Sequence, residues 1–500
     1  FFAREKYGIE NEEILRSIES HTTGRPNMSL LDKIIYIADY IEPGRDVAPN
    51  LPEVRALAFV DIDACLYRIL EDTLAYLAEK GATLDPATEE TFLYYKNLNQ
   101  QEVKKCIELA EDQHYIRREL TKRRLIAFVA NGSILPRESG VSQKPMKGAI
   151  AFEAPESMEV EMELPHRGKI KGMGIPEGIT LIVGGGYHGK STLLKALEQG
   201  IYNHVAGDGR EFVITDDTAW KLRAEDGRKI KDVDISLFIN HLPNGRNTRR
   251  FSTLDASGST SQAANIIEAI EAKSQVLLID EDTSATNFMV RDELMQRVIQ
   301  KDKEPITPFL ERARDLYEKA GISTILVVGS CGSYFYIADQ IIQMDNYCPV
   351  DITEKTRKLL KEYKKPDCKA EGFVLPSEKR SISFGSSVVR RKNYRGTGMV
   401  EEHEKLKVMG RESLMLGKEQ LDLRYLEQLA DREQTQTLGY LLKYAKEQYS
   451  GKTTDLTALM ESLIRKLEKE GIGSVSGQKE IPARMAMPRR QEIYACFNRF

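Results

Sequence analysis

The stretch 184–192, Gly-Gly-Gly-Tyr-His-Gly-Lys-Ser-Thr, matches the pattern G-x-x-x-x-G-K-[ST] of a phosphate-binding loop. The apolar run Ile179–Val183 precedes it and the run Leu193–Leu197 follows it, which predicts a strand before the loop and a helix after it. In that setting backbone N–H groups wrap the phosphates, and the helix N-terminus adds the positive end of its dipole. The chain is therefore predicted to bind a nucleotide through Gly184, Gly185, Gly186, Tyr187, His188, Gly189, Lys190, Ser191 and Thr192.

A second segment, Ser274–Asp282, contains an apolar run that ends in adjacent carboxylates. Asp280 is expected to hold Mg²⁺ through water, together with the hydroxyl of Ser191, while Lys190 reaches the outer phosphates of ATP. Glu281 is placed to orient and deprotonate an attacking water. Alone, the segment could equally be an ordinary core strand with a polar turn, but the loop about ninety residues upstream favours the catalytic interpretation. The predicted catalytic residues are Glu281 and Lys190.

Between these two segments, Ser257 and Gly258 lead through Gln262 into the apolar stretch Ile266–Ile270. The segment resembles a degenerate signature motif of ABC ATPases. In that family the serine and glycine bind the γ-phosphate of a nucleotide held by a partner subunit. The resemblance therefore implies an ATP site at a homodimer interface, with Ser257, Gly258 and Gln262 contributing to it. The alternative is a Ser/Gly-rich loop with an N-cap, and the order of the three motifs favours the first interpretation.

The resemblance extends over about residues 101–450. It is closest to the bacterial and archaeal family called predicted ATPases of the ABC class, on the stretches 111–113, 127–137, 184–192, 207–211, 223–228, 256–265 and 280–289. It implies an α/β P-loop core at 101–350, with ATP and Mg²⁺ as cofactors, and a C-terminal segment of the same family at 351–500.

One loop departs from the transporter-type ABC ATPases, in which a switch histidine follows an apolar strand. Here the run Thr324–Val328 is followed by Gly-Ser-Cys-Gly at 329–332. The predicted ATPases of the ABC class also carry a Gly/Ser-rich loop at this place. Ser330 either supplies a hydrogen bond in place of the histidine or belongs to a capped turn, and the loop is compatible with slow turnover. For the Q-loop glutamine, Asn240 is the one candidate.

The first part of the chain, about residues 1–98, has a different resemblance. Its segment Ser20–Arg45 is similar to the C-terminal half of the HD-domain symmetrical bis(5'-nucleosyl)-tetraphosphatases of the YqeK type. Apolar residues at 30, 31, 34, 35, 38 and 41 predict an amphipathic helix. In that family the residues matching His21 and Asp39 belong to a metal site. The histidine and the His-Asp pair that complete the site are absent, so we expect a helical remnant with an empty site and no phosphohydrolase activity.

The two resemblances meet near Leu98–Val103, inside both domains, and the chain begins at Phe1 instead of Met. Gene fusion, deletion or an error of sequence assembly would each produce this junction. We favour a deletion or an error, because a fusion rarely cuts through two cores.

A chain of 500 residues predicts two or three domains. Its formal net charge of -4 gives no global attraction to nucleic acid or to a membrane surface. No apolar run approaches the roughly twenty residues needed to span a bilayer. The six cysteines form no C-x-x-C pair, so neither a zinc site nor a disulfide framework is indicated. These features predict a cytoplasmic protein without a membrane partner.

Beyond Tyr347, helices are expected at 355–365, 421–429 and 437–449, with a polar stretch at 376–397 and an exposed tail at 484–499. The basic cluster Val388–Arg395 either touches phosphate backbones or forms a solvated loop. The predicted fold class is thus an α/β P-loop ABC-type ATPase core, with a short all-α HD-domain remnant at the N-terminus and a small, mostly helical C-terminal segment.

Two classes of function follow. The first is ATP hydrolysis by an ABC-class dimer that acts on nucleic acid or on a protein assembly. The second is hydrolysis of dinucleoside polyphosphates by the HD part, assembled with another chain. The absent His-Asp pair favours the first. Their products differ: ADP and phosphate from ATP in one case, two ADP from diadenosine tetraphosphate in the other.

Overall fold

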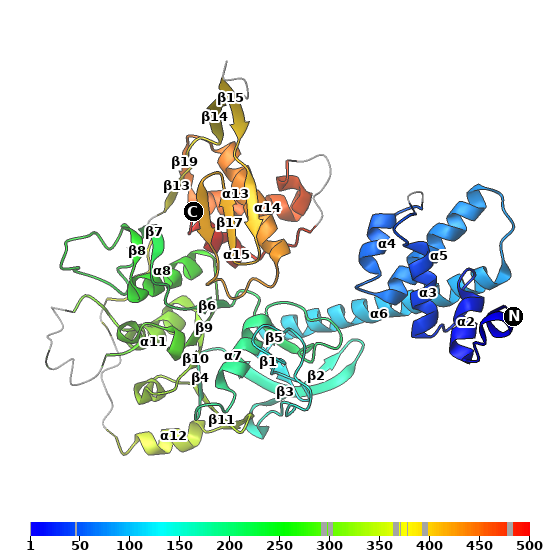
Figure 1. Cartoon of the computed structure of the whole chain (residues 1–500). Coiled ribbons are helices and arrows are strands. Elements are labelled where there is room, and N and C mark those ends of the chain that lie inside the picture. Colours follow the sequence, from blue (N-terminus) through cyan, green and yellow to red (C-terminus); the bar gives the residue numbers. More distant parts are fainter. Residues whose placement is uncertain are drawn as a thin grey trace. The chain divides into compact units, whose positions relative to one another are not determined.

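The chain forms two compact units, Phe1–Glu111 and Asp112–Phe500, in the computed structural model (Figure 1). The first unit is helical, and the second combines helices with strands. The structure describes residues 2–45, 48–291, 298, 304–363, 370, 372–377, 379–392, 399–477 and 484–500, with the backbone alone at 388–392 and 399–403. The domain limits 1–98, 101–350 and 351–500 stay predictions.

The described part of the first unit contains α1 (Phe2–Tyr7), α2 (Glu12–Ser20), α3 (Leu30–Tyr40), α4 (Leu51–Leu57), α5 (Ile62–Glu79) and the start of α6 (Pro86–Lys122). Ser29 and Asp32 form a capping box that fixes where α3 begins. The predicted helix is confirmed, but its predicted apolar face is wrong. Leu30 and Ile34 are 64% and 49% exposed, because α3 packs on α5 through the face that carries the buried residues Tyr36 and Ile37.

The second unit is built around a sheet with the strand order β12-β11-β4-β10-β9-β6. Its strands are β4 (Ile179–Val183), β6 (Trp220–Leu222), β9 (Val276–Asp280), β10 (Ser323–Val327), β11 (Gln340–Asp345) and β12 (Cys348–Asp351). All pairings in this sheet are parallel except that of β11 with β12. Strands β4, β9 and β10 are buried along their whole length, as expected of a parallel sheet covered on both faces. The α/β core is confirmed.

Alternate residues of these strands face two different hydrophobic cores, because successive side chains of a strand point to opposite faces. Leu181 and Leu277 belong to a core shared with α8 (Gly258–Glu271) and α11 (Phe309–Ala320). Ile182 and Leu278 belong to a core shared with α7 (Lys190–Gln199). The second core also includes residues of an antiparallel sheet, β2-β3-β1-β5, with strands β2 (Glu159–Leu164), β3 (Gly168–Pro176), β1 (Leu125–Ala130) and β5 (Val213–Thr215). Helix α7 therefore packs against both sheets (Figure 1).

The C-terminal part combines helices with short strands. The helices are α12 (Thr353–Leu360), α13 (Arg432–Gln448), α14 (Leu456–Glu470) and α15 (Arg490–Phe497). The strands are β13 (Ser381–Ser383), β14 (Val388–Lys392), β15 (Met399–His403), β16 (Leu406–Met409), β17 (Ser413–Leu416), β18 (Glu419–Asp422) and β19 (Thr453–Asp455). Buried leucines of β17 and α13 join the core of the central sheet on its α8 side, so this part and the sheet share one core.

Several predictions for this part are corrected. The helix expected at 421–429 is wrong, because Leu421 and Leu423 are buried around the exposed Asp422, which is the period of an extended chain. The tail expected at 484–499 is α15 over much of its length, with Tyr494 and Cys496 fully buried. The polar stretch at 376–397 contains β13 and β14, so residues 388–392 of the basic cluster form a strand and not a loop, and residues 393–395 lie outside the described residues. The helix at 437–449 is confirmed as part of α13.

None of the helices in the described part of the chain has the length and the apolar character that crossing a bilayer requires. The thiols of the described cysteines are free, at Cys65, Cys106, Cys331, Cys348 and Cys496. Cys368 lies outside the described residues.

Candidate functional site

Three neighbouring strands bring their carboxyl ends to one edge of the central sheet. β10 lies between β4 and β9, and its register places Val327 level with both Ile182 and Asp280. The chain leaves β4 into the phosphate-binding loop, leaves β9 at Glu281 and leaves β10 into the turn that follows Val328. In open α/β sheets, ligands bind at such an edge. The predicted phosphate loop and the predicted carboxylates are thus brought together.

The phosphate-binding loop depends on glycine at two positions. Gly184 has φ +139°, and a Cβ atom there would lie 2.4 Å from the carbonyl oxygen of Met344. Gly189 has φ +97°, and a Cβ atom would lie 3.0 Å from the ring of Tyr347. L side chains rarely adopt such conformations, so the sequence pattern has a steric reason. Helix α7 begins directly afterwards at Lys190, as predicted.

Side chains of the loop hold it in shape. The Lys190 ammonium donates to the carbonyl oxygens of Gly184 and Gly185, both at 2.8 Å. The His188 ring accepts a hydrogen bond from the Asn346 N–H at 2.9 Å through Nδ1, which ties the loop to the turn between β11 and β12. Tyr187 is 99% exposed at φ +63°. Lys190 and His188 therefore order the loop, while Tyr187 projects into solvent.

Ser191 and Asp280 face each other across the site. The Ser191 hydroxyl lies 3.4 Å from Asp280 Oδ2, and Asp280 Oδ1 accepts the N–H of Asp282 at 3.1 Å. A hydroxyl and a carboxylate oxygen are the hard oxygen donors that Mg²⁺ prefers. The pair fits the predicted Mg²⁺ site, and Thr192 is half-buried one residue further along α7.

Glu281 is held by the turn after β10. Its Oε2 accepts the N–H groups of Gly329 at 2.6 Å and Ser330 at 3.1 Å, and its Oε1 accepts the Ser330 hydroxyl at 2.5 Å. The sequence left open whether Ser330 supplies a hydrogen bond in place of the switch histidine or belongs to a capped turn, and it gave no link to Glu281. The missing signal was the strand order, since only the adjacency of β9 and β10 brings Ser330 to Glu281.

The signature-like residues lie at the start of α8. Ser257 is the N-cap residue, and its hydroxyl pairs with that of Thr260 at 2.8 Å instead of capping the helix. Gln262 is fully buried, donates to the Ser284 hydroxyl at 3.0 Å and accepts the Ala285 N–H at 2.9 Å. It thereby braces the loop that follows the Asp280–Glu281 end. Among the described residues, the Ser257 hydroxyl bonds only within the start of α8, and Gly258 lies against Ala224, Ala285 and Asp226, so neither reaches the phosphate loop of the same chain.

His21 and Asp39 have separate surroundings in the first unit. His21 Nδ1 lies 2.6 Å from the carbonyl oxygen of Ile18, and its Nε2 lies 3.1 Å from the Thr22 hydroxyl. Asp39 is exposed, 3.8 Å from the Arg45 guanidinium. Within the described residues, no group of three or more His, Cys, Asp or Glu side chains is arranged to hold a metal ion. In the second unit, Asn240 donates to the Ser236 carbonyl at 2.5 Å, a local contact within its own turn.

Comparison with known families agrees with this geometry. The family described as ABC_ATPase, P-loop domain, matches residues 99–380, more than half of the chain. The chain belongs to the ABC ATPase P-loop family. Membership implies nucleotide binding by the phosphate loop. The MRB1590 C-terminal domain matches residues 405–500 of this ABC ATPase. An uncharacterized protein of Methanocaldococcus jannaschii, MJ1628, is 36% identical over 228 residues, which are 44% of this chain and 50% of that protein.

The N-terminal segment is homologous to HD-domain hydrolases. A symmetrical bis(5'-nucleosyl)-tetraphosphatase of Halalkalibacterium halodurans is 45% identical over 92 residues, 18% of this chain and 49% of that protein. The Bacillus subtilis enzyme of the same description is 41% identical over 95 residues, 19% of this chain and 49% of its own. A crystal structure described as a predicted HD superfamily hydrolase involved in NAD metabolism from Clostridium acetobutylicum is 45% identical, with coverage of 19% and 50% and a TM-score of 0.19. The chain spans about half the length of the curated relatives it matches.

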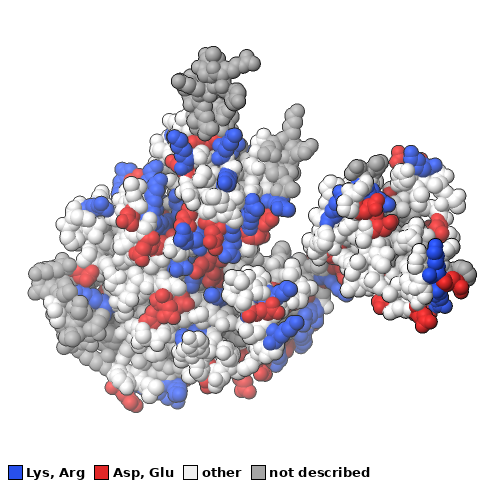
Figure 2. All heavy atoms as spheres, in the orientation of Figure 1, with Lys and Arg blue, Asp and Glu red and all other residues white. Residues whose placement is uncertain are grey.

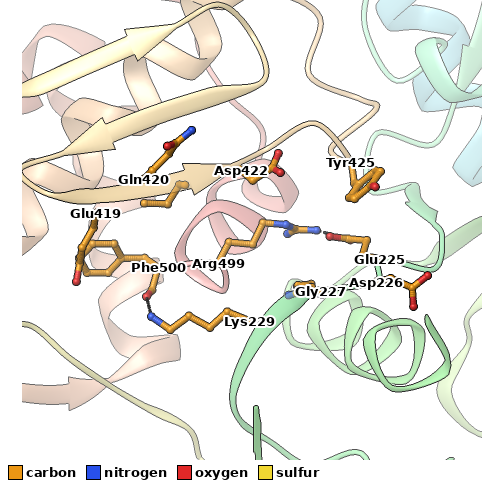
Figure 3. A pocket seen from close by; sticks show the side chains of 12 residues that line it. Glu225, Asp226, Gly227, Lys229, Glu419, Gln420, Asp422, Tyr425, Arg499 and Phe500 are labelled. Atoms are coloured by element: carbon orange, nitrogen blue, oxygen red, sulfur yellow. Dashed lines mark hydrogen bonds and ion pairs between the residues drawn. The ribbon is translucent and has the colours of Figure 1, made fainter. Parts of the chain in front are cut away.

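This ABC ATPase contains a buried ionic network that the sequence did not predict. Glu225 pairs with Arg499, two residues beyond the end of α15 (Figure 3), and accepts a hydrogen bond from Asn265 of α8. Arg228 pairs with Glu268 of α8. Burial alone would raise the pKa of Glu225, but Arg499 and Arg228 hold it below its usual value. Residues 223–228 belong to the resemblance to the predicted ATPases of the ABC class, but that resemblance assigned them no function. Glu268, a carboxylate inside the apolar run Ile266–Ile270, was the available signal.

This network borders a cavity of about 330 Å³, which lies between the start of β7 (the strand Arg228–Val233) and the hairpin that ends in β18. Figure 3 shows Arg499 reaching across it to Glu225, and Lys229 reaching the carbonyl oxygen of Phe500. The C-terminal part is thus fastened to the helix that carries the signature-like residues.

The glycine requirement at position 184 gives a first prediction. The substitution Gly184→Ala puts a methyl group against a backbone carbonyl that cannot rotate away, at a φ that costs about 1–3 kcal/mol for an L residue. We expect ATP binding to weaken by about tenfold or more, measured by titration with a fluorescent ATP analogue.

The matched control is Gly186→Ala in the same loop, where a Cβ atom meets nothing within 4 Å. It is expected to bind like the unaltered protein. Equal affinities for the two variants, with both proteins folded, would contradict the account of the loop.

Proposed function

We propose that this chain binds ATP in the 184–192 loop and hydrolyses it to ADP and phosphate. The observation that supports this most directly is the position of Glu281. Glu281 directly follows β9, at the same edge of the sheet as the phosphate loop that follows β4, and only β10 separates the two strands. The neighbouring residue Asp280 pairs with Ser191 of the loop. A storage site for nucleotide would need no second carboxylate at this place.

In the proposed reaction, water attacks the γ-phosphorus, a new O–P bond forms, and the bond from that phosphorus to the bridging oxygen breaks. ADP leaves with the electron pair of the broken bond, and Glu281 takes the proton of the water. Lys190 would turn from the Gly184 and Gly185 carbonyls to the outer phosphates. Mg²⁺, held by Ser191 and Asp280, would neutralise phosphate charge when bound.

We propose further that the working form is a homodimer with ATP at its interface. Ser257 and Gly258 lie at the N-terminus of the 14-residue helix α8, where backbone N–H groups are available to a phosphate. The described contacts of these two residues do not reach the phosphate loop of their own chain. We therefore infer that the phosphate they would bind is the γ-phosphate of ATP held by a second copy of the chain. The two sites of such a dimer are related by a two-fold axis.

The partner on which the dimer would act is proposed to be nucleic acid or a macromolecular assembly. The visible face of the second unit carries Lys and Arg side by side with Asp and Glu (Figure 2). This face therefore supplies no single-sign field that would choose between the two partners. A cytoplasmic location is proposed because the described cysteines are free thiols.

Hydrolysis of diadenosine tetraphosphate is the second candidate, supported by the 45% identity of the N-terminal segment to a symmetrical bis(5'-nucleosyl)-tetraphosphatase. We favour the ATPase because the phosphate loop and the carboxylates are brought together at one edge of the sheet, whereas His21 and Asp39 have separate surroundings. Product analysis separates the two reactions.

Glu281→Gln is the substitution that tests the proposed base. The amide keeps nearly the same shape, so ATP binding should persist, whereas loss of the proton acceptor should slow hydrolysis by about a hundred- to ten-thousand-fold. The measurement is phosphate release from ATP, with nucleotide binding followed in parallel. Unchanged turnover would remove Glu281 from the mechanism, and two ADP from diadenosine tetraphosphate would favour the second candidate.

A mixing experiment tests the shared site. Lys190→Ala and Ser257→Arg each disable both sites of a homodimer, but a heterodimer collects both lesions in one site and leaves the other intact. With free subunit exchange, about a quarter of all sites should regain activity. The measurement is ATPase activity of the mixture against that of each variant alone. A mixture that gives only the average of its parents would show that each chain acts by itself.

A further inference from the structure

Both carboxylate oxygens of Glu281 are occupied by one short turn. Oε2 receives two backbone N–H groups, from Gly329 at 2.6 Å and Ser330 at 3.1 Å, and Oε1 receives the Ser330 hydroxyl at 2.5 Å. The turn follows β10, which lies between the phosphate-loop strand and the strand that ends at Asp280. Three donors from two adjacent residues thus converge on one carboxylate.

The acceptor capacity of a carboxylate shows what is left for chemistry. Its two oxygens offer about four lone-pair positions. Two N–H groups fill both positions of Oε2, and the hydroxyl fills one position of Oε1. A single acceptor position remains, on Oε1, and it is the place where an attacking water can be bound.

We propose that the Gly329–Ser330 turn orients Glu281 and that Ser330 is a positioning residue of ATP hydrolysis. This inference rests on the proposed ATPase function. In transporter-type relatives the residue at this turn is a histidine directed at the γ-phosphate. Here the turn acts on the base, and it presents one lone pair of Oε1 to the water.

The arrangement is suited to orientation more than to stability. Gly329 and Ser330 are exposed and Glu281 is only partly buried. A hydrogen bond in such a place contributes little to the stability of the fold. A small displacement of a reacting group, in contrast, slows a reaction strongly. Loss of the Ser330 hydroxyl should therefore leave the fold intact and slow the chemical step.

The test is single-turnover ATP hydrolysis by the full chain. Ser330→Ala should lower the rate about tenfold, as expected for one hydrogen bond to a charged group, with the Kd for ATP changed less than about twofold. Ser330→Thr restores the hydroxyl and should recover most of the rate. The matched control is Ser333→Ala, three residues further along the chain in the 3₁₀ helix Gly332–Tyr336, whose hydroxyl bonds with Cys331 and not with Glu281. It should keep the unaltered rate.

A second background separates positioning from a general structural effect. In Glu281→Ala the carboxylate is gone, so adding Ser330→Ala should cause no further loss. An equal tenfold loss in that background, or a Ser330→Ala rate equal to that of the unaltered chain, overturns the inference while the proposed function stands. Unchanged hydrolysis by Glu281→Gln also overturns the inference, because Glu281 is then not the base, whereas a lack of ATP hydrolysis by the unaltered chain overturns the proposed function itself.

Discussion

Parallel pairing of β4, β10 and β9 is the constraint on which the site depends. It sets Ile182, Val327 and Asp280 at one level, so that the segments leaving the three strands meet at one edge of the sheet. Neither the phosphate loop nor the carboxylates could form a site alone, because they are about ninety residues apart in the chain. Shifting one strand by a single residue would also turn its buried side chains from one core to the other, so the two hydrophobic cores protect this register.

Two buried polar systems connect this edge to the rest of the second unit. Gln262 links helix α8, which carries the signature-like residues, to the loop after Asp280–Glu281 through Ser284 and Ala285. One turn further along the same face of α8, Asn265 and Glu225 join it to Arg499, just beyond α15. Buried charges are tolerated only when they are paired, and here the pairing fixes how the C-terminal part is attached. The helix that would contact a second copy's nucleotide is therefore held by both systems along its buried face.

Much of the site was predictable from the sequence, because its local parts are governed by local rules. The glycines at 184 and 189, the strand before them and the helix at Lys190 follow from backbone sterics and hydrophobic pattern. The partner of Ser330 was not predictable, since it depends on which strands are neighbours. The extended chain at Leu421 and Leu423 was not predicted, because the alternation of buried and exposed residues there is too short to show a period. Helix α15 was not predicted to be buried, because its burial depends on residues that are distant in the chain.

The central claim is that ATP and its metal occupy the edge formed by β4, β10 and β9. The most direct test is a crystal structure of the Glu281→Gln protein with ATP and Mg²⁺. The account predicts the triphosphate in the 184–192 loop, with the metal between Ser191 and Asp280 and the γ-phosphate facing the residue at 281. A triphosphate bound at any other place, or a metal held by other side chains, would contradict it.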